Sequence, residues 1–236
     1  MASSRRVVVG AVLLMASVQY FAAELIAASA WHDPPYNWRD DYISDLGAVE
    51  CGPHICSPYH AVIGTSLVLH ACVVLLATGL LSGMISSRGA RSTVGALVVV
   101  HAAGNLIVAY SPLRPISDLN RLHYFGAALA ICGGIAAIGL VGVVCLRGPG
   151  RRVFGVLSVA VGTVSLVALL LVRWNATRDE GLPDGLLERM AVDPIVVWCV
   201  VTGAVLLVTT YRRASVCGPD ASGYRENRKP TEGRQP

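Results

Sequence analysis

Long apolar blocks separated by polar connections dominate the chain. Six blocks approach or exceed the roughly 20 predominantly apolar residues that a helix needs to cross the hydrocarbon core of a membrane. They cover residues 7–29, 59–86, 92–110, 122–146, 153–172 and 194–211. Because the apolar residues fall in uninterrupted runs and not in short periodic ones, the pattern predicts an all-α integral membrane protein. We expect residues 1–211 to form one bundle of six transmembrane helices.

The composition points to the same class. Of the 236 residues, 54% are apolar and only 14% are charged, whereas soluble domains average about a quarter charged residues. The formal net charge is +4, and the basic residues are spread over the connections and the C-terminal tail. Nucleic-acid binding needs a clustered basic surface. The sequence therefore argues against nucleic acid as a partner and favours membrane lipids.

The basic residues also predict the topology. The N-terminus, the second and fourth connections and the C-terminal tail together carry 13 of the 19 Lys and Arg residues. Cytoplasmic segments carry this excess, so we expect cytoplasmic N and C termini. Residues 212–236 contain few apolar side chains and bury too little surface to offset their ordering entropy. They are predicted to form a disordered basic cytoplasmic tail.

Acidic residues gather on the opposite side. Eleven of the 15 Asp and Glu residues lie in the three connections that are predicted to face outward. Two of these connections, 30–58 and 173–193, are long, and long connections are more often functional than short ones. We therefore expect any binding or catalytic site at the outer face.

Several polar side chains near the outer face are candidate site residues. Glu24 lies inside the outer part of the first span, where a buried ionisable group is a functional hypothesis, although reaching the interface or a structural hydrogen bond also explains it. His60 and His123 open the second and fourth spans beside the acidic connections. Asn105 shares a helix face with His101, one turn away. Hydrogen bonding between helices is the structural explanation for these deeper polar residues.

Two further segments of the outer connections predict local structure. Cys51 and Cys56 suggest a disulfide that closes a small loop in an oxidising compartment; metal binding together with His54 is the weaker alternative. Residues 181–190 place leucines at helical spacing and carry Glu188 and Arg189. This segment forms a short interfacial helix, or it brings the Arg189 fork to the mouth of the bundle, where it suits a phosphate or carboxylate.

Two motifs resemble a known family. The bacterial and archaeal membrane proteins grouped as domain of unknown function family 998 show similar patterns over roughly residues 7–211. The motifs are Ile43-Ser44-Asp45-Leu46-Gly47, then Cys51, Cys56-Ser57-Pro58 and His60, and further on Gly185-Leu186-Leu187-Glu188-Arg189. The resemblance implies a six-helix bundle, here expected as a multi-pass protein of a bacterial plasma membrane, and it implies no particular activity.

Two functions from different classes fit these residues. The first is a non-catalytic membrane protein that binds lipid or has a structural or accessory role. The second is an intramembrane enzyme, of hydrolase or transferase type, that acts on a lipid or lipid-linked substrate at the outer leaflet. In either case the candidate binding residues are Glu24, Ser44, Asn105, Glu188 and Arg189.

In the catalytic alternative, Asp45, His60 and His123 are the candidate acid and base groups, since carboxylate and imidazole transfer protons near neutral pH. The same three side chains are candidates for a metal site with an open position. This is the weaker version because the chain has no HExxH pair, and the sequence identifies no cofactor. We expect Asp45, His60, His123 and Arg189 to line one outward-facing cavity, with Glu24 or Asn105 at its floor. Arg189 would keep Asp45 ionised.

Overall fold

A computed structural model describes residues 4–32, 34–52, 55–114, 120–178 and 180–216 of the chain. Within these ranges the protein is helical and contains no strand. Six spans are long and apolar enough to cross a membrane, which confirms the predicted fold class. The elements in chain order are α1 (Ser4–Ala16), α2 (Gln19–Ser29), η1 (Ile43–Gly47), α3 (His60–Leu81), η2 (Ser82–Met84), α4 (Arg88–Tyr110), α5 (Asn120–Leu146), α6 (Arg152–Arg178) and α7 (Asp184–Val216).

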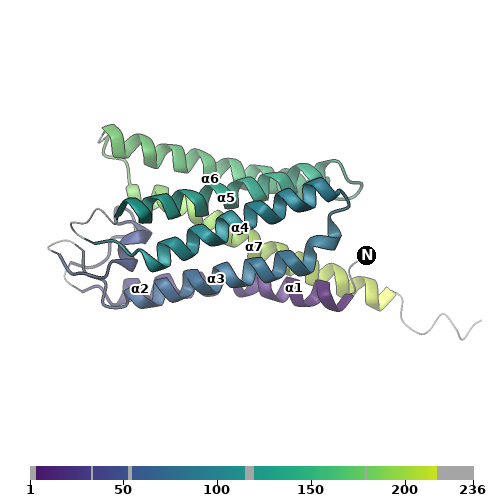
Figure 1. The fold of residues 1–236 in the computed structure, drawn as a ribbon, viewed down its shortest axis with the longest axis horizontal. Coiled ribbons are helices and arrows are strands. Elements are labelled where there is room, and N and C mark those ends of the chain that lie inside the picture. Colours follow the sequence, from purple (N-terminus) through teal and green to yellow (C-terminus); the bar gives the residue numbers. More distant parts are fainter. Residues whose placement is uncertain (1–3, 33, 53–54, 115–119, 179, 217–236) are drawn as a thin grey trace, which may run out of the picture.

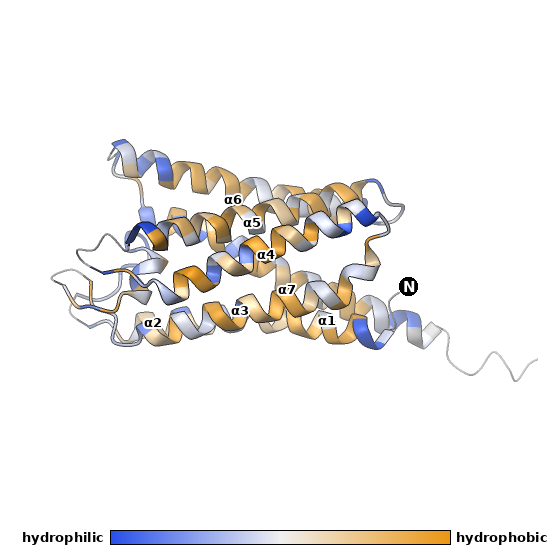
Figure 2. Cartoon of the chain, in the orientation of Figure 1, coloured by the Kyte–Doolittle hydropathy of each residue, from blue (hydrophilic) through white to orange (hydrophobic). Residues whose placement is uncertain are grey.

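The spans lie side by side in one elongated bundle with two distinct ends (Figure 1). α1 begins and α7 ends at the end that we call the termini end. The opposite end, which we call the loop end, carries η1 and the connection that leads into α3. Hydrophobic residues follow the middle of the spans and hydrophilic residues gather at both ends (Figure 2). This distribution is the one that a bilayer requires of a protein that crosses it.

The first span consists of two helices. Between α1 and α2 the amide groups of Ser17 and Tyr20 donate to carbonyl groups three residues earlier, at 3.2 and 3.1 Å. Such bonds tighten a helix locally while they keep its backbone groups paired, which hydrocarbon surroundings require. The two helices therefore cross as one span, Ser4–Ser29, and α2 buries Tyr20 and Glu24 in the bundle.

The last span starts earlier than predicted. Instead of a separate interfacial helix at 181–190 and a span from 194, α7 runs unbroken from Asp184 to Val216 with Pro194 inside it. A proline removes one backbone hydrogen bond, and transmembrane helices tolerate this where neighbouring groups compensate. Asp184 in the first turn suits the positive end of the helix dipole. α7 also includes residues 212–216, which corrects the start of the predicted tail, and residues 217–236 lie outside the described residues.

Glycines bring α4 and α5 together in the half of the bundle nearer the loop end. A Cβ atom added at Gly104 would lie 2.2 Å from the Ala130 amide nitrogen, and one at Gly133 would lie 2.8 Å from the His101 amide nitrogen. Small residues permit such close helix contacts in membranes. At the termini end α5 instead approaches α6, where a Cβ at Gly155 would lie 2.8 Å from the Leu146 amide nitrogen.

The connection between α2 and α3 packs onto the loop end. Trp31, Tyr36 and Leu46 are buried against residues of α2 and α3. The Ser57 hydroxyl donates to the Leu46 carbonyl at 2.6 Å. Cys51 and Cys56 form a disulfide, as predicted. The connection is therefore a folded cap that fixes η1 over the bundle.

Candidate functional site

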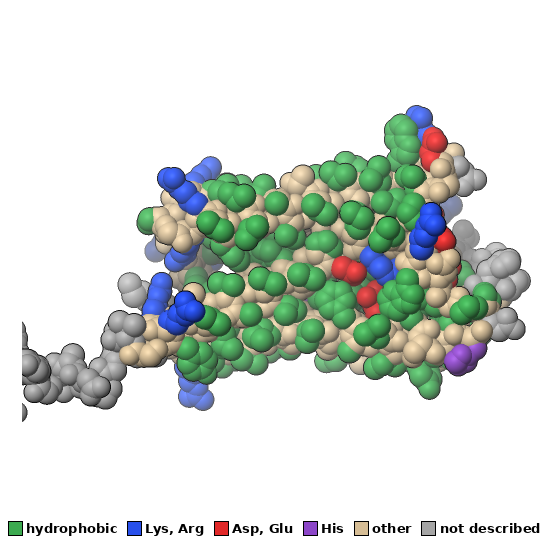
Figure 3. Space-filling model, turned by 180° about the vertical axis from the view of Figure 1, so that it is seen from behind, with side chains coloured by type: hydrophobic (Ala, Val, Ile, Leu, Met, Phe, Trp, Pro, Cys, Tyr) green, Lys and Arg blue, Asp and Glu red, His purple; other side chains and the backbone are tan. Residues whose placement is uncertain are grey.

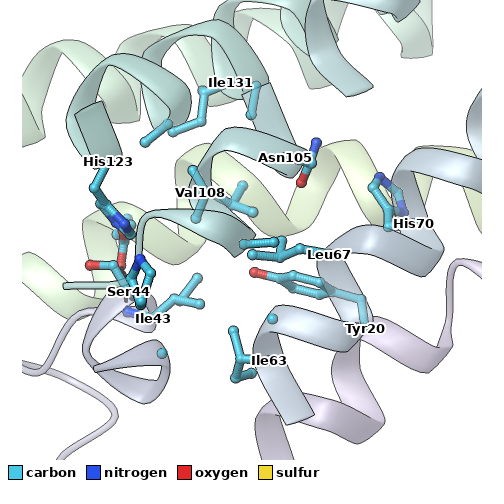
Figure 4. Close-up of a pocket in the computed structure, with 18 of the residues that line it drawn as sticks. Tyr20, Ile43, Ser44, Ile63, Leu67, His70, Asn105, Val108, His123 and Ile131 are labelled. Carbon is cyan, nitrogen blue, oxygen red and sulfur yellow. Dashed lines mark hydrogen bonds between the residues drawn. The ribbon is translucent and has the colours of Figure 1, made fainter. Parts of the chain in front are cut away.

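A cavity of about 150 Å³ lies under this cap, between η1 and helices α2, α3, α4, α5 and α7. The predicted site residues that line it are Ser44, His60, Asn105, His123 and Glu188, whereas Glu24, Asp45 and Arg189 do not. Tyr20, His70 and His101 also line it. Figure 4 shows polar atoms of this set around a space that is walled by Ile43, Ile63, Leu67 and Val108. The site is thus a small apolar cavity with a few polar groups.

The buried His101 side chain has a defined tautomer. Its Nδ1 lies 2.6 Å from the Ala130 carbonyl oxygen, and because a carbonyl only accepts, Nδ1 carries the proton. The Asn105 amide nitrogen lies 3.3 Å from His101 Nε2 and donates to the His101 carbonyl at 2.9 Å. The His101 Nε2 atom is therefore an acceptor.

His70 completes a histidine pair across α3 and α4. Its Nε2 lies 3.1 Å from His101 Nε2, and since the latter accepts, His70 Nε2 donates. The remaining ring nitrogen of His70, Nδ1, is then an unprotonated acceptor. This atom is buried and has no hydrogen-bond partner among the described residues, although His70 lines the cavity. A buried acceptor without a partner needs an explanation, and a donor inside the cavity would supply one.

Two further histidines, at the loop end, donate through Nδ1 to a backbone carbonyl as His101 does. His123 Nδ1 donates to the Ser111 carbonyl at 2.9 Å, and His60 Nδ1 donates to the Ser57 carbonyl at 3.1 Å. In the neutral ring, Nε2 of each residue is then an acceptor without a proton. Both residues line the cavity. Ser111 is the C-cap of α4, and Ser57 lies just before α3, so both histidines bind carbonyls of the adjoining connections.

Tyr20 lines the cavity but was not among the site residues predicted from the sequence. Its ring is 3% exposed and tilts against His70, with 6.4 Å between the ring centroids. Figure 4 shows its hydroxyl directed into the cavity, and no hydrogen bond joins it to another described residue. The signal in the sequence was its place one turn before Glu24 on the same helix face. An aromatic residue in a span does not stand out by type.

Asp45 has a structural contact instead of a place in the cavity. Its Oδ2 accepts a hydrogen bond from the Tyr42 amide at 3.1 Å, at the start of η1, so it caps that helix. No ion pair joins it to Arg189 within the described ranges, which corrects the expected pairing. Burial raises the pKa of Asp45 to about 6, opposed by the Tyr42 amide bond and assisted by the Asp41 charge.

Glu188, from α7, also binds the start of η1. Its Oε2 accepts hydrogen bonds from the Ile43 amide and from the Ser44 amide at 3.4 Å. A carboxylate on the free amides of a helix start is a stabilising contact. Glu188 therefore forms part of the cavity wall and also fixes the element that supplies Ile43 and Ser44 to the same wall.

Arg189 faces the cap and not the cavity. One guanidinium nitrogen, Nη1, donates to the carbonyls of Trp38 and Gly185 at 3.1 and 3.0 Å, and Nη2 donates to the Tyr36 hydroxyl. The guanidinium carbon lies 4.7 Å from the centre of the Trp38 ring, within the range of a cation–π contact. These bonds occupy the fork that was expected to bind an anionic ligand.

Glu24 lies outside the cavity, in a second group of buried polar atoms. It is 3% exposed, and its Oε1 has no hydrogen-bond partner among the described residues, as is also true of Asp193 Oδ1 and Arg189 Nε. Seen from behind, acidic and basic side chains interrupt the apolar surface of the loop-end half (Figure 3). Of the two residues predicted at the cavity floor, Asn105 lines the cavity and Glu24 does not.

The side chains considered as metal ligands are not assembled into a metal site. In the ranges that the structure describes, no group of three or more His, Cys, Asp or Glu side chains could hold a metal ion. The Asp45 carboxylate binds the amide at the start of η1, and a backbone carbonyl orients each of the His60 and His123 imidazoles. The arrangement can instead accept hydrogen bonds from a small bound group.

Fold and site together define a multi-pass helical membrane protein with a histidine-lined cavity near one end. The family model described as "Protein of unknown function (DUF998)" matches residues 8–205. The chain therefore belongs to this family, as the motifs at 43–60 and 185–189 indicated. Searches of curated proteins and of solved structures find no match to this chain.

Proposed function

We propose that the protein is a lipid-binding membrane protein whose cavity at the loop end takes a small headgroup rich in hydrogen-bond donors. The observation that carries this proposal is that His70 Nδ1 is buried without a hydrogen-bond partner among the described residues, while carbonyl oxygens bind only the Nδ1 atoms of His60 and His123. His70 Nδ1, His60 Nε2 and His123 Nε2 belong to residues that line one space. Hydroxyl or ammonium groups are the matching donors.

The size of the cavity limits what enters it. An engineered cavity of about 150 Å³ in another protein takes up benzene, so the space here suits a group of roughly six non-hydrogen atoms. A glycerol or ethanolamine headgroup is of this size. The apolar wall formed by Ile63, Leu67 and Val108 suits the carbon atoms of such a group and disfavours bulk water.

The proposal includes the location of the protein. Basic residues dominate the termini end and acidic connections dominate the loop end, which supports cytoplasmic termini in a bacterial plasma membrane. The cavity then lies near the outer leaflet. Membrane lipids are the proposed partners, and nucleic acid is not.

The test compares variants that remove one polar atom each. Tyr20→Phe removes only the hydroxyl. His123→Asn keeps a side-chain amide nitrogen that can donate to the Ser111 carbonyl, while it removes the Nε2 acceptor. The control is Tyr124→Phe, which removes a hydroxyl from an exposed residue next in sequence to His123.

Native mass spectrometry of the detergent-solubilised full chain would measure binding of monoacylglycerol and of phosphatidylethanolamine. We expect saturable binding of one of these probes. It should weaken about fivefold to tenfold in Tyr20→Phe and in His123→Asn, the loss typical of one hydrogen bond, and stay unchanged in Tyr124→Phe. Binding that is absent for both probes, or equal in all variants, would overturn the proposal.

An enzyme acting on a lipid is the second candidate, and one observation favours it. The unprotonated Nε2 of His123 is oriented by a carbonyl in the manner of a general base. The carboxylate that such a base needs as a partner is not beside it, because Asp45 and Glu188 both bind η1 amides. Release of a cleavage product from the bound probe by the wild type, with no release by His123→Asn, would replace the binding role with the catalytic one.

A further inference from the structure

A second and larger cavity lies at the termini end. Its volume is about 760 Å³, within the range of about 300–1,000 Å³ that is typical of ligand sites. α1, α3, α4, α5 and α7 supply most of its wall, and apolar side chains such as Val98, Val141, Phe154 and Trp198 dominate it. Protein interiors are normally close-packed, so an apolar space of this size calls for an occupant.

The helix contacts explain why the bundle opens there. α4 and α5 touch through Gly104 and Gly133 in the loop-end half, whereas at the termini end α5 turns its glycine contacts to α6. Gly95, near the start of α4, has nothing within 4 Å of its Cβ position. Figure 3 shows a gap between the helices at this end, with blue basic side chains around it.

Arginines stand at the mouth of this cavity. Arg91, Arg151 and Arg213 line it, and no acidic side chain of the described residues lines it with them. Arg91 is held in place because its Nε and Nη2 donate to the Ile85 carbonyl at 3.2 and 2.8 Å. Arg151 and Arg213 are exposed and form no ion pair within the described ranges.

An apolar space with three arginines at its edge matches one class of molecule. The ends of the spans lie at the level of lipid headgroups. Arginine recognises phosphate through parallel N–H donors, and an acyl chain is the apolar group available next to a transmembrane helix. A zwitterionic headgroup would bring its own cation against the three arginines. A net negative headgroup would not.

We propose that this cavity, lined by Val98, Val141 and Trp198 with Arg91, Arg151 and Arg213 at its mouth, binds an anionic phospholipid of the adjacent leaflet. The acyl chain fills the apolar space and the phosphate meets the arginines. This site is separate from the cavity at the loop end and shares no residue with it. It holds a whole lipid chain, which the smaller cavity cannot.

The experiment tests the charge and the space separately. The charge variant is Arg91→Gln/Arg151→Gln/Arg213→Gln. Its matched control is Arg88→Gln/Arg147→Gln/Arg212→Gln, which removes three exposed charges at the same end from residues that do not line the cavity. The space variant is Val141→Phe, and its control is Val143→Phe on the same helix, at an exposed position that does not line the cavity.

The readout is the number of phosphatidylglycerol and phosphatidylcholine molecules that remain bound to the full chain in native mass spectrometry. We expect one phosphatidylglycerol per chain in the wild type and binding at least about tenfold weaker in the charge variant, since hydrogen bonds to charged groups exceed this factor. Binding should also weaken in Val141→Phe, because the larger ring occupies part of the apolar space. Both controls should bind as the wild type does, and phosphatidylcholine should bind more weakly.

Three outcomes would overturn the proposal. Equal binding of the two lipids would remove the anionic specificity, and equal losses in the charge variant and its control would reduce it to general surface attraction. Unchanged binding in Val141→Phe would place the lipid outside the cavity. If the charge variant fails to fold, Val141→Phe with its control still decides the question. Tyr20→Phe should leave phosphatidylglycerol binding unchanged, so the two cavities are tested independently.

Discussion

Gly185→Ala should release the cap from α7, because the helix and the cap touch backbone to backbone at this residue. A Cβ atom at position 185 would lie 2.2 Å from the Asp41 carbonyl oxygen and 3.0 Å from the Asp41 amide nitrogen. An ordinary contact begins near 3.4 Å, so the two segments must separate by about 1.2 Å. The atoms in the way are backbone atoms and cannot rotate aside.

A separation of this size affects three hydrogen bonds. The Leu186 amide donates to the Arg39 carbonyl at 2.9 Å, Arg189 donates to the Asp41 carbonyl at 3.3 Å, and Glu188 accepts from the Ile43 amide. Each bond contributes about 1 kcal/mol, for a loss of about 2–3 kcal/mol. Alanine returns up to about 1 kcal/mol through its helix propensity. We expect the free energy of unfolding to fall by about 1–2 kcal/mol.

Thermal unfolding of the purified protein in detergent measures this effect. The matched control is Gly139→Ala in α5, where nothing lies within 4 Å of the Cβ position, so this variant should be as stable as the wild type or slightly more stable. If Gly185→Ala unfolds at the same temperature as Gly139→Ala, the cap does not depend on this contact and the reasoning is refuted.

Three further predictions concern charge, covalent structure and topology. Burial raises the pKa of Asp45 from 3.8 to about 6, so the folded state prefers the protonated carboxyl group, and stability should fall as pH rises from about 4 to about 6, by at most about 3 kcal/mol. Asp45→Asn should remove this dependence and stabilise the protein at pH 7; a less stable Asp45→Asn protein at pH 7 would contradict it. Cys51 and Cys56 should resist alkylation until a reductant is added, and free labelling of either would be incompatible with the disulfide. A reporter fused after Arg213 should report a cytoplasmic position and one inserted at residue 180 an external position, the reverse pair being the refuting result.

The spans were predictable because the bilayer imposes a simple rule on them. Length and apolar content alone identify a helix that crosses hydrocarbon, and all six spans were found in this way. The start of α7 was not, because Pro194 resembles the beginning of a helix when only the sequence is available. In the bundle the helix continues through it to Asp184, where Asn175 of α6 donates to the Asp184 carboxylate at 2.6 Å.

The sequence predicted at which end of the bundle the site residues lie, but not which of their side chains face the cavity. Sequence reasoning placed Ser44, His60, Asn105, His123 and Glu188 near one end, and the structure brings them to one cavity. It could not decide which of two neighbours faces the cavity. Successive residues of a helix point about 100° apart, since one turn takes 3.6 residues. Glu188 and Arg189 therefore point in different directions from α7, so that Glu188 lines the cavity whereas Arg189 faces the cap.

The charged residues of the two sequence motifs have structural roles and not the catalytic or ligand-binding roles that their chemistry suggests. Glu188 binds the amides of Ile43 and Ser44, and Asp45 binds the Tyr42 amide, so the carboxylates of both motifs stabilise η1. Arg189 binds the carbonyls and the aromatic rings of the cap. The charged residues of the motifs thus hold two walls of the cavity together, while its free polar atoms come from Tyr20 and the histidines on α3 and α5. Substitution of Glu188 or Arg189 should therefore reduce ligand binding and stability together, whereas Tyr20→Phe should reduce binding alone.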